Sequence, residues 1–399
     1  MHSFIAQNNW ITSAGASILR NKVLSESKIL SFFDFNDFKV FKEAGIQTMI
    51  FVLKKEVEIK PYTLEYYKLI NKNVSKEELT NFLISKKTNP NVEHFEAEID
   101  PINLKNKLIA FVNKGVEDTL KKIRLKGDYH LTNKNVAQGI VCPQEFVIDS
   151  HIKVLGDSIK KGDGIFVLKH NELTQLKLTQ KEKEIIKPFY TSKQLHKYYG
   201  DSKNDLWIIY ANMRVRKHIE EYPTIKSHLD KFKKIVTSDF APYGLHRARD
   251  QTFFEGNKIM SLRKTDKPFF TYTTFPCYVS QTYFIIKPDD INLKYLVGLL
   301  NSKLIGFWLY YNGKRQGEQL QIDKEPLLSI PIIKKENKEI IDIVDLLIDL
   351  NQKLSQANLD REKESFKEQI TVLETKIDEI VYNLYNLSKD EKELINNKK

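Results

Sequence analysis

Two short apolar runs near the start of the chain, Ile29-Leu30-Ser31-Phe32-Phe33-Asp34-Phe35 and Ile46-Gln47-Thr48-Met49-Ile50-Phe51-Val52-Leu53, decide the fold of the first domain. Both are rich in β-branched or aromatic residues, which predicts two β-strands joined by a hairpin. Upstream, residues 14–24 place apolar side chains at helical spacing, which predicts a helix. Strands this apolar are typical of a sheet covered on both faces. Left uncovered, residues 29–53 would make the protein self-associate or dissolve poorly.

The composition limits the class of protein. The chain has 399 residues with 41% hydrophobic content, enough for two or three domains. Its apolar runs are too short or too often interrupted by Asp to span a bilayer, and the first residues lack the pattern of a signal peptide. Two isolated cysteines, Cys142 and Cys277, argue against a structural zinc and fit a reduced setting. We therefore expect a cytoplasmic protein without a membrane segment or a metal.

Positive charge is concentrated in the middle of the sequence. The formal net charge is +11. Residues 151–335 contain 32 Lys and Arg against 19 Asp and Glu, a net charge of +13, while the remainder has 31 against 33, a net charge of −2. Basic proteins often have no nucleic-acid partner, but concentration of the excess in one segment favours a polyanion.

Beyond the first strands the character of the chain changes twice. Residues 56–137 are charged and rich in Lys and Asn, with helical pieces that begin at a capping-box pattern, Ser75-Lys76-Glu77-Glu78. From Gln138 onward, short β-rich runs alternate with helical pieces, which predicts an α+β domain. Near the end, Phe366, Ile370, Leu373, Ile377, Ile380 and Leu384 form an apolar seam of heptad type. The seam predicts an antiparallel helical hairpin within the chain, or else a coiled-coil contact between chains.

Several stretches resemble a known family. Phe33-Asp34-Phe35-Asn36-Asp37-Phe38 and Val40-Phe41-Lys42-Glu43-Ala44 resemble the last strands of the catalytic domain in adenine-specific DNA methyltransferases of type IIG restriction-modification enzymes. The TaqI-like specificity domain of those enzymes is resembled by a series of runs in the same order: Ile186-Lys187-Pro188-Phe189, Ile225-Lys226-Ser227-His228-Leu229, Gln281-Thr282-Tyr283-Phe284-Ile285-Ile286 and Tyr295-Leu296-Val297-Gly298-Leu299-Leu300-Asn301-Ser302. The end of their specificity region is resembled by Ile377-Asp378-Glu379-Ile380-Val381-Tyr382-Asn383-Leu384-Tyr385-Asn386-Leu387-Ser388.

The resemblance implies a domain order. Residues 1–55 would be a remnant of the methyltransferase catalytic domain, and residues 56–137 a variable helical connector. Residues 138–335 would be the target-recognition domain, and residues 336–399 a helical hairpin. The expected fold class is therefore α+β: a strand pair, a mixed α/β TaqI-like recognition domain, and a C-terminal helical hairpin.

The chain lacks the motifs that the family uses for methyl transfer. Such enzymes hold S-adenosylmethionine on a Gly-rich strand-to-helix turn and the flipped base on an Asn/Asp-Pro-Pro-aromatic quartet. The one Gly-x-Gly, Gly162-Asp163-Gly164, leads into a strand and is typical of a hairpin turn, while Asn89-Pro90-Asn91-Val92 lacks the second proline and the aromatic residue. Glu58-Ile59-Lys60 resembles a nuclease triplet but has no acidic strand before it. We expect no catalytic residue and no cofactor site in this chain alone, and hence no activity.

Candidate binding residues remain. The family places an aromatic residue on its last strands against the extruded base, and Phe51, or less favourably Phe41, holds that position, although a core phenylalanine is the simpler interpretation. Arginine suits bidentate contacts with guanine edges, and both basic side chains suit phosphates. The candidates for DNA contact are Arg214, Arg216, Arg247, Arg249, Arg263, Lys264 and Arg315. If the backbone is extended, each Arg-x-Arg pair lies on one face. Surface salt bridges are the alternative role for any one of them.

The sequence therefore predicts a module that recognises duplex DNA within a type IIG-like adenine methyltransferase or restriction-modification system. The catalytic motifs would come from a separate chain, or this chain is a truncated product. A phage-exclusion system is an alternative setting for the same domain. A helical assembly protein with incidental basic charge is an alternative of a different class.

Overall fold

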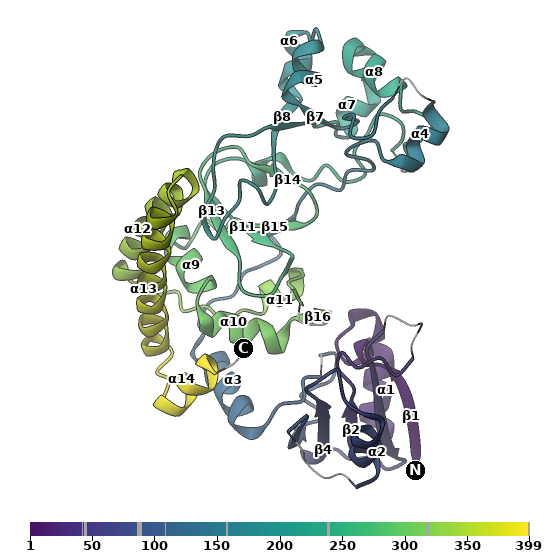
Figure 1. Cartoon of the computed structure of the whole chain (residues 1–399), viewed down its shortest axis with the longest axis vertical. Helices are drawn as coiled ribbons and strands as arrows, with labels where there is room; N and C mark the ends of the chain where they lie inside the picture. The colour runs from purple at the N-terminus through teal and green to yellow at the C-terminus, as the bar shows by residue number, and fades with distance from the viewer. Residues whose placement is uncertain are drawn as a thin grey trace. The chain divides into compact units, whose positions relative to one another are not determined.

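The protein is described here by a computed structural model. It describes residues 1–397 except 42, 44–45, 86–89, 108, 157–158, 238–239 and 317–318, and omits the side chains of residues 14, 85, 314–316 and 319. The chain forms two compact units (Figure 1), the first made of residues 1–127, 307–321 and 385–399, and the second of residues 128–306 and 322–384. Within the described residues, no helix combines the length and apolar character that crossing a membrane requires.

The first unit is built on a five-stranded mixed sheet in the order β1-β3-β2-β4-β5. Strands β2 and β4 run parallel, and the other neighbouring strands pair antiparallel. The two strands predicted from the opening runs are present as β2 and β3, and the predicted helix is α1. The elements of this unit are β1 (His2–Gln7), α1 (Ser17–Glu26), β2 (Lys28–Asp34), β3 (Thr48–Lys54), β4 (Tyr62–Leu69), α2 (Lys76–Ser85), β5 (Val92–Ile99), α3 (Lys114–Lys126), β16 (Lys314–Gln316), β17 (Gln319–Gln321) and α14 (Lys389–Asn396).

Both faces of this sheet are covered from within the chain. On one face Val23 and Leu24 of α1, together with Ile109, pack over Phe32 and Phe51. On the other face α2 covers the sheet. Its Phe82 is fully buried and meets the rings of Phe33 and Tyr67 at centroid distances of 5.5 and 6.2 Å. The apolar strands therefore have the cover that their composition demands.

Residues 56–137 differ from the expected helical connector, because they supply two of the five strands. The run Tyr62-Thr63-Leu64-Glu65-Tyr66 alternates buried and more exposed positions, as a strand with two different faces does. Strand β4 pairs with β2 over residues 65–68, and β5 pairs along the whole of β4. The expected self-association through residues 29–53 loses its physical reason, since the connector itself completes the sheet.

The second unit holds two sheets. One has four strands in the order β14-β8-β10-β7, and the other has five in the order β6-β15-β11-β13-β9. Its elements up to α8 are β6 (Val136–Gln138), α4 (Asp149–Leu155), β7 (Val167–Lys169), α5 (His170–Gln175), α6 (Gln180–Glu184), β8 (Ile186–Tyr190), β9 (Tyr198–Tyr199), β10 (Leu206–Ile209), α7 (Met213–Lys217) and α8 (Pro223–Asp230). The elements that follow are β11 (Lys258–Leu262), β12 (Lys264–Thr265), β13 (Phe270–Thr273), β14 (Tyr278–Val279), β15 (Tyr283–Ile286), α9 (Leu293–Leu300), α11 (Lys324–Leu328), α12 (Lys338–Gln356) and α13 (Asp360–Leu384). Helix α10 (Lys303–Asn312) runs across the boundary between the two units.

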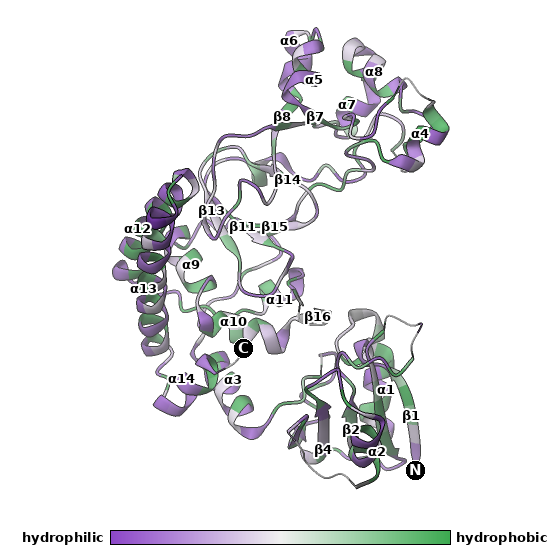
Figure 2. Ribbon diagram, viewed as in Figure 1, coloured by the Kyte–Doolittle hydropathy of each residue, from purple (hydrophilic) through white to green (hydrophobic). Residues whose placement is uncertain are grey.

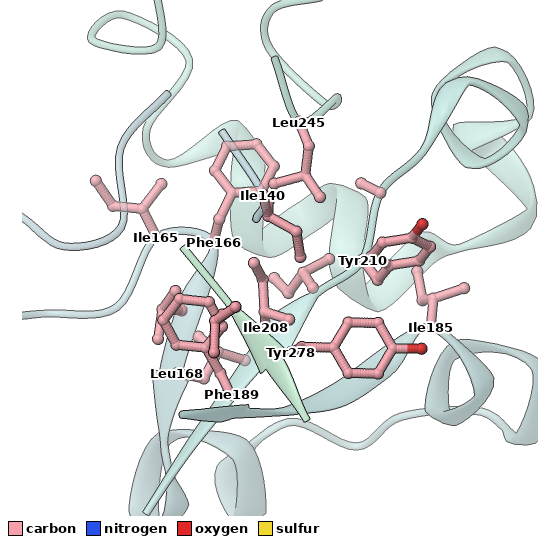
Figure 3. Close-up of a cluster of buried hydrophobic side chains, with 14 of the residues drawn as sticks. Ile140, Ile165, Phe166, Leu168, Ile185, Phe189, Ile208, Tyr210, Leu245 and Tyr278 are labelled. Atoms are coloured by element: carbon pink, nitrogen blue, oxygen red, sulfur yellow. The ribbon is translucent and has the colours of Figure 1, made fainter. Parts of the chain in front are cut away.

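The core of the second unit lies on the four-stranded sheet. Phe166, Leu168, Phe189 and Ile208 come from its strands or the residue beside them, and all are buried in one apolar cluster. Figure 3 shows these side chains converging, with Tyr278 and Tyr210 on one side and Leu245 above them. This cluster fixes the segments that carry the candidate site.

The C-terminal helices form the predicted hairpin. Helix α12 packs against both α13 and α9, and Figure 1 shows α12 and α13 side by side. Close approach of α9 and α12 depends on Gly298, because a Cβ atom there would lie 2.6 Å from a methyl carbon of Ile340. The last helix, α14, departs from the expected single segment of residues 336–399, since it belongs to the first unit. Its Glu391 pairs with Lys122 of α3 at 2.7 Å.

Candidate nucleic-acid interface

Two segments of the second unit bring basic side chains to one place. The first is the short helix α7. Asn212 caps it by accepting hydrogen bonds from the backbone N–H groups of Arg214 and Val215, at 3.0 and 3.1 Å. The buried Val215 anchors the helix in the core. Because the backbone is helical, Arg214 and Arg216 project in different directions, and the predicted extended pair is not formed.

The second segment, residues 240–249, is tied to the core at three points. The N–H of Leu245 donates to the carbonyl of Ala211 at 3.0 Å. Val141 and Arg247 exchange two backbone hydrogen bonds of 3.0 and 3.1 Å. The hydroxyl of Tyr210 donates to the carbonyl of Arg249 at 2.6 Å. These contacts hold a segment without regular secondary structure in one conformation beside α7.

A hollow of about 280 Å³ lies between the two segments. Its lining combines apolar side chains with two of the predicted arginines: Asn212, Met213, Arg216, Phe240, Gly244, Leu245, His246, Ala248 and Arg249. The guanidinium carbon of Arg216 lies 5.0 Å from the centre of the Phe240 ring, a cation–π contact. A Cβ atom on Gly244 would lie 3.0 Å from both of these side chains, so the glycine permits their close packing.

Arg249 is held firmly at the rim of the hollow. Its Nη2 donates to Oε1 of Gln138 at 2.7 Å, and its Nε donates to the carbonyl of Gly139 at 3.3 Å. The residue has a positive φ of 68°, which a non-glycine side chain rarely adopts. Burial, and then the nearby charge of Arg247, lower the pKa of the Arg249 guanidinium. These contacts hold the Arg249 side chain in one direction.

Four of the predicted DNA-binding residues lie in or beside the two segments of the hollow. Arg216 and Arg249 line the same hollow. Arg247 is exposed, and its charge lies close enough to lower the pKa of Arg249. Arg214 is exposed on α7.

The remaining candidates lie elsewhere. Arg263 forms an ion pair with Asp323, with Nε 2.6 Å from Oδ1, so the structure assigns it an internal partner. Lys264 is exposed on β12 and stays a prediction. The side chain of Arg315 lies outside the described residues.

Phe51 is a core residue in the structure. Its ring lies 5.2 Å from the Trp10 ring and 5.8 Å from the Phe32 ring, measured between centroids, and the residue belongs to the buried cluster under α1. This is the simpler of the two interpretations offered by the sequence, and its burial removes the main reason to assign a base pocket there. Phe41, the second candidate, is exposed. Among the described residues, no group of three or more His, Cys, Asp or Glu side chains could hold a metal ion.

Sequence reasoning missed several residues of the hollow. Phe240 and His246 line it, with ring centroids 6.2 Å apart. Both precede the Arg-x-Arg pair, in the run Phe240-Ala241-Pro242-Tyr243-Gly244-Leu245-His246-Arg247. The available signal was the proline and glycine, which mark an irregular segment able to carry contacts.

Comparisons with known proteins agree with this architecture. Residues 187–332 match the sequence model of the TaqI-like C-terminal specificity domain, which confirms the resemblance for that segment. All residues lining the hollow fall within it. A search of curated proteins finds no match.

One solved structure has a similar fold. The type IIL restriction-modification enzyme MmeI, solved in complex with DNA, is similar at a TM-score of 0.63 with 12% identity, over 98% of this chain and 48% of that one. The type IIG restriction endonuclease BpuSI matches 96% of this chain and 47% of that one with 11% identity, but its TM-score of 0.32 is too low to support a structural argument. The chain thus spans about half the length of these relatives. Its fold is similar to that of MmeI, and residues 187–332 match the TaqI-like specificity domain.

Proposed function

We propose that this chain recognises duplex DNA as the specificity part of a restriction-modification system of the type IIG-like adenine methyltransferase class. The observation that carries the proposal is the hollow beside α7. It lies within the TaqI-like specificity domain and combines arginines with apolar walls. The concentration of positive charge in residues 151–335 supports a polyanionic partner.

The arginines have different parts in this proposal. Arg214 and Arg247 are exposed and suited to phosphates or guanine edges. Arg249 is held by Gln138 and Gly139, so it presents its remaining donors in a fixed direction. The apolar walls around Met213 and Leu245 suit sugars and thymine methyl groups. Together they provide positioning contacts at the rim and a shaped surface between them.

Methylation itself would need a catalytic chain. The residues of this sequence supply neither a Gly-rich turn for S-adenosylmethionine nor an Asn-Pro-Pro-aromatic quartet, and the pocket candidate Phe51 is enclosed in the core. We infer that this chain sets the DNA sequence, while the cofactor and the base pocket come from a catalytic part outside residues 1–399, on a separate polypeptide or on a longer form of this chain. A phage-exclusion system would use the same recognition surface.

The helical-assembly alternative receives less support. Within the apolar seam, Ile377 is buried where α13 packs against α12 and α9, and the other five side chains are half-buried. A side chain already buried within the chain is poorly placed to drive a coiled-coil contact with another one. DNA recognition therefore accounts for more of the observed features.

The first test compares two double variants of equal charge. Arg214→Ala with Arg247→Ala removes two exposed cations at the site, whereas Lys338→Ala with Arg361→Ala removes two exposed cations from the C-terminal hairpin. Fluorescence anisotropy with random-sequence duplexes, from about 50 to 200 mM salt, measures affinity and its salt dependence. If both arginines neutralise phosphates, the negative slope of log K against log salt becomes shallower by about 2 in the site variant.

The outcome decides the assignment. Equal loss of affinity in the two variants would mean that the effect is general charge, and the hollow would not be the interface. Loss confined to the site variant supports the proposal. Selection from a random duplex library should then yield a defined sequence with the parent protein. If either arginine contacts a base, the site variant should select a less defined sequence and lose about 1–3 kcal/mol of binding free energy at that contact.

A further inference from the structure

The guanidinium group of Arg249 is held along one of its edges. Its Nε–H and one N–H of Nη2 lie side by side, and they donate to the carbonyl of Gly139 at 3.3 Å and to Oε1 of Gln138 at 2.7 Å. The next edge has one N–H of Nη1 parallel to the second N–H of Nη2. In the described part of the chain, no acceptor or carboxylate engages that edge. Arg249 therefore presents a bidentate donor in a fixed plane.

Gln138, at the end of β6, is itself oriented by the sheet. Its Nε2 donates to the carbonyl of Gln281 at 3.3 Å, so that Oε1 is left to accept from Arg249. In the five-stranded sheet of the second unit, Gln138 pairs with Phe284 of β15. Gln138 thus connects the arginine to the sheet, although it lies outside the matched residues 187–332.

The backbone of Arg249 is held as well. Its φ of 68° lies in the left-handed region, and the hydroxyl of Tyr210 donates to its carbonyl at 2.6 Å. A side chain other than glycine keeps such a conformation only where the surroundings impose it, and such residues cluster at functional sites. Backbone and side chain are therefore both arranged before a ligand arrives, which reduces the entropy that binding would cost.

The surroundings of Arg249 suit an uncharged group. Met213, Leu245 and Ala248 line the same hollow. Apolar walls make it costly to remove water from a phosphate, because its charge is then poorly solvated. The edge of a base carries no net charge and meets a smaller penalty. Cations for phosphates are available nearby, since Figure 2 shows hydrophilic residues along α7, where Arg214 is exposed.

We propose that Arg249 reads one guanine of the recognition sequence through bidentate hydrogen bonds to its O6 and N7 atoms in the major groove, and that Gln138 is the positioning residue that orients Arg249. This inference rests on the proposed function, because it names the base that the hollow selects. Adenine presents an amino donor where guanine presents O6, so it would oppose the second N–H of the fixed arginine.

The test combines a change in the protein with a change of one atom in the DNA. Selection from a random duplex library gives the sequence that the parent prefers, and each guanine in it is replaced in turn by 7-deazaguanine, which lacks the N7 acceptor. At one position this should weaken binding by the parent at least about fivefold. Arg249→Lys keeps the charge but loses the planar fork, so the same replacement should weaken it no further. Arg361→Lys, at an exposed position of α13, is the control and should respond like the parent.

Two variants of Gln138 test the positioning role without changing Arg249. Gln138→Leu removes the acceptor for Nη2 and should reduce the sensitivity to 7-deazaguanine at that position. Gln138→Glu retains an acceptor and should retain the sensitivity. Thermal unfolding establishes that each variant is folded, and the Gln138 pair carries the test if Arg249→Lys does not fold.

The outcomes separate this inference from the proposed function. Sensitivity at one guanine that Arg249→Lys and Gln138→Leu both lose supports it. Uniform weakening of all duplexes by Arg249→Lys, with 7-deazaguanine tolerated at every position, would indicate a phosphate contact and overturn it. Binding without sequence preference would also overturn it while leaving DNA binding established, and sensitivity unchanged in Gln138→Leu would remove the positioning role. If the parent bound no duplex DNA at all, the proposed function would fall, and this inference with it.

Discussion

Removing the carboxylate of Glu182 should strongly destabilise the second unit. Glu182 lies in α6 and is fully buried. It accepts hydrogen bonds from the backbone N–H groups of Thr179 at 2.8 Å, Thr224 at 2.6 Å and Ile225 at 3.0 Å. It thereby joins the start of α6 to the first turn of α8. With Thr179 it also forms a capping box, in the run Thr179-Gln180-Lys181-Glu182.

The magnitude follows from the three donors. Glu182→Ala leaves three backbone N–H groups without their acceptor, and each such loss costs about 1–3 kcal/mol when the group stays buried. We expect a total of roughly 3–5 kcal/mol, near the upper limit of single substitutions. Glu182→Gln keeps one acceptor oxygen and should cost about 1–3 kcal/mol. Glu184→Ala, in an exposed position of the same helix, is the control and should stay within about 0.5 kcal/mol.

The pH dependence gives a second measurement. Burial alone would raise the pKa of Glu182, but the backbone N–H groups of Thr179, Ile225 and Thr224 outweigh it, so the pKa in the folded protein lies below its ordinary value of 4.5. The stability contributed by the carboxylate is therefore present above pH 4.5 and is lost as the pH falls through the folded-state pKa. Urea unfolding followed by circular dichroism at several pH values measures the difference between parent and Glu182→Gln. A difference that does not shrink in acid, or a cost of Glu182→Ala below about 1 kcal/mol, would refute the assignment.

Two further predictions concern backbone approach and a buried base. A Cβ atom on Gly139 would lie 2.1 Å from the carbonyl oxygen of Ser280. Gly139→Ala should therefore cost about 2–3 kcal/mol of stability, measured by thermal unfolding, and disturb the contact with Arg249. Gly115→Ala in α3 is the control and should not destabilise, because the nearest atom to a Cβ there lies 3.6 Å away. Burial lowers the pKa of Lys258 to about 8 from 10.5, so the unfolded chain binds the extra proton between these values and stability should rise by about 3 kcal/mol as the pH increases across that window. Lys258→Met should abolish this rise, and a rise that persists in the variant would assign it to another group.

Much of the fold could be predicted where one local signal dominated. The strands β2 and β3 followed from runs of β-branched and aromatic residues. The capping box at Ser75 forms as expected, with Glu78 accepting from the backbone N–H of the serine at 2.7 Å, and Ser388 forms another with Glu391 at 2.6 Å. Strand β5 was missed because its glutamates gave the segment a charged composition, although Val92, Ala97 and Ile99 supply the buried positions. Average composition obscured a pattern of period two.

The candidate site was less predictable, because it depends on the local backbone. Arg214-x-Arg216 suggested an extended pair, but the Asn before Met213 is an N-cap that starts a helix instead. Neighbouring arginines in the sequence were therefore separated, while Arg216 and Arg249, 33 positions apart, line one hollow. Only the tertiary fold relates these two.

The way the chain is divided between its two units limits how such a protein can be rebuilt. The chain passes between units at residues 127–128, 306–307, 321–322 and 384–385. A recombination event that exchanges a single contiguous stretch beginning at residue 128 would therefore import segments that belong to the other unit. To transfer a new specificity unit intact, the exchange must place its ends at all four junctions. Otherwise it must be confined to residues that belong to one unit. The segment of residues 212–249 meets that condition, so new recognition sequences should be obtained more easily by substitution there than by swapping whole domains.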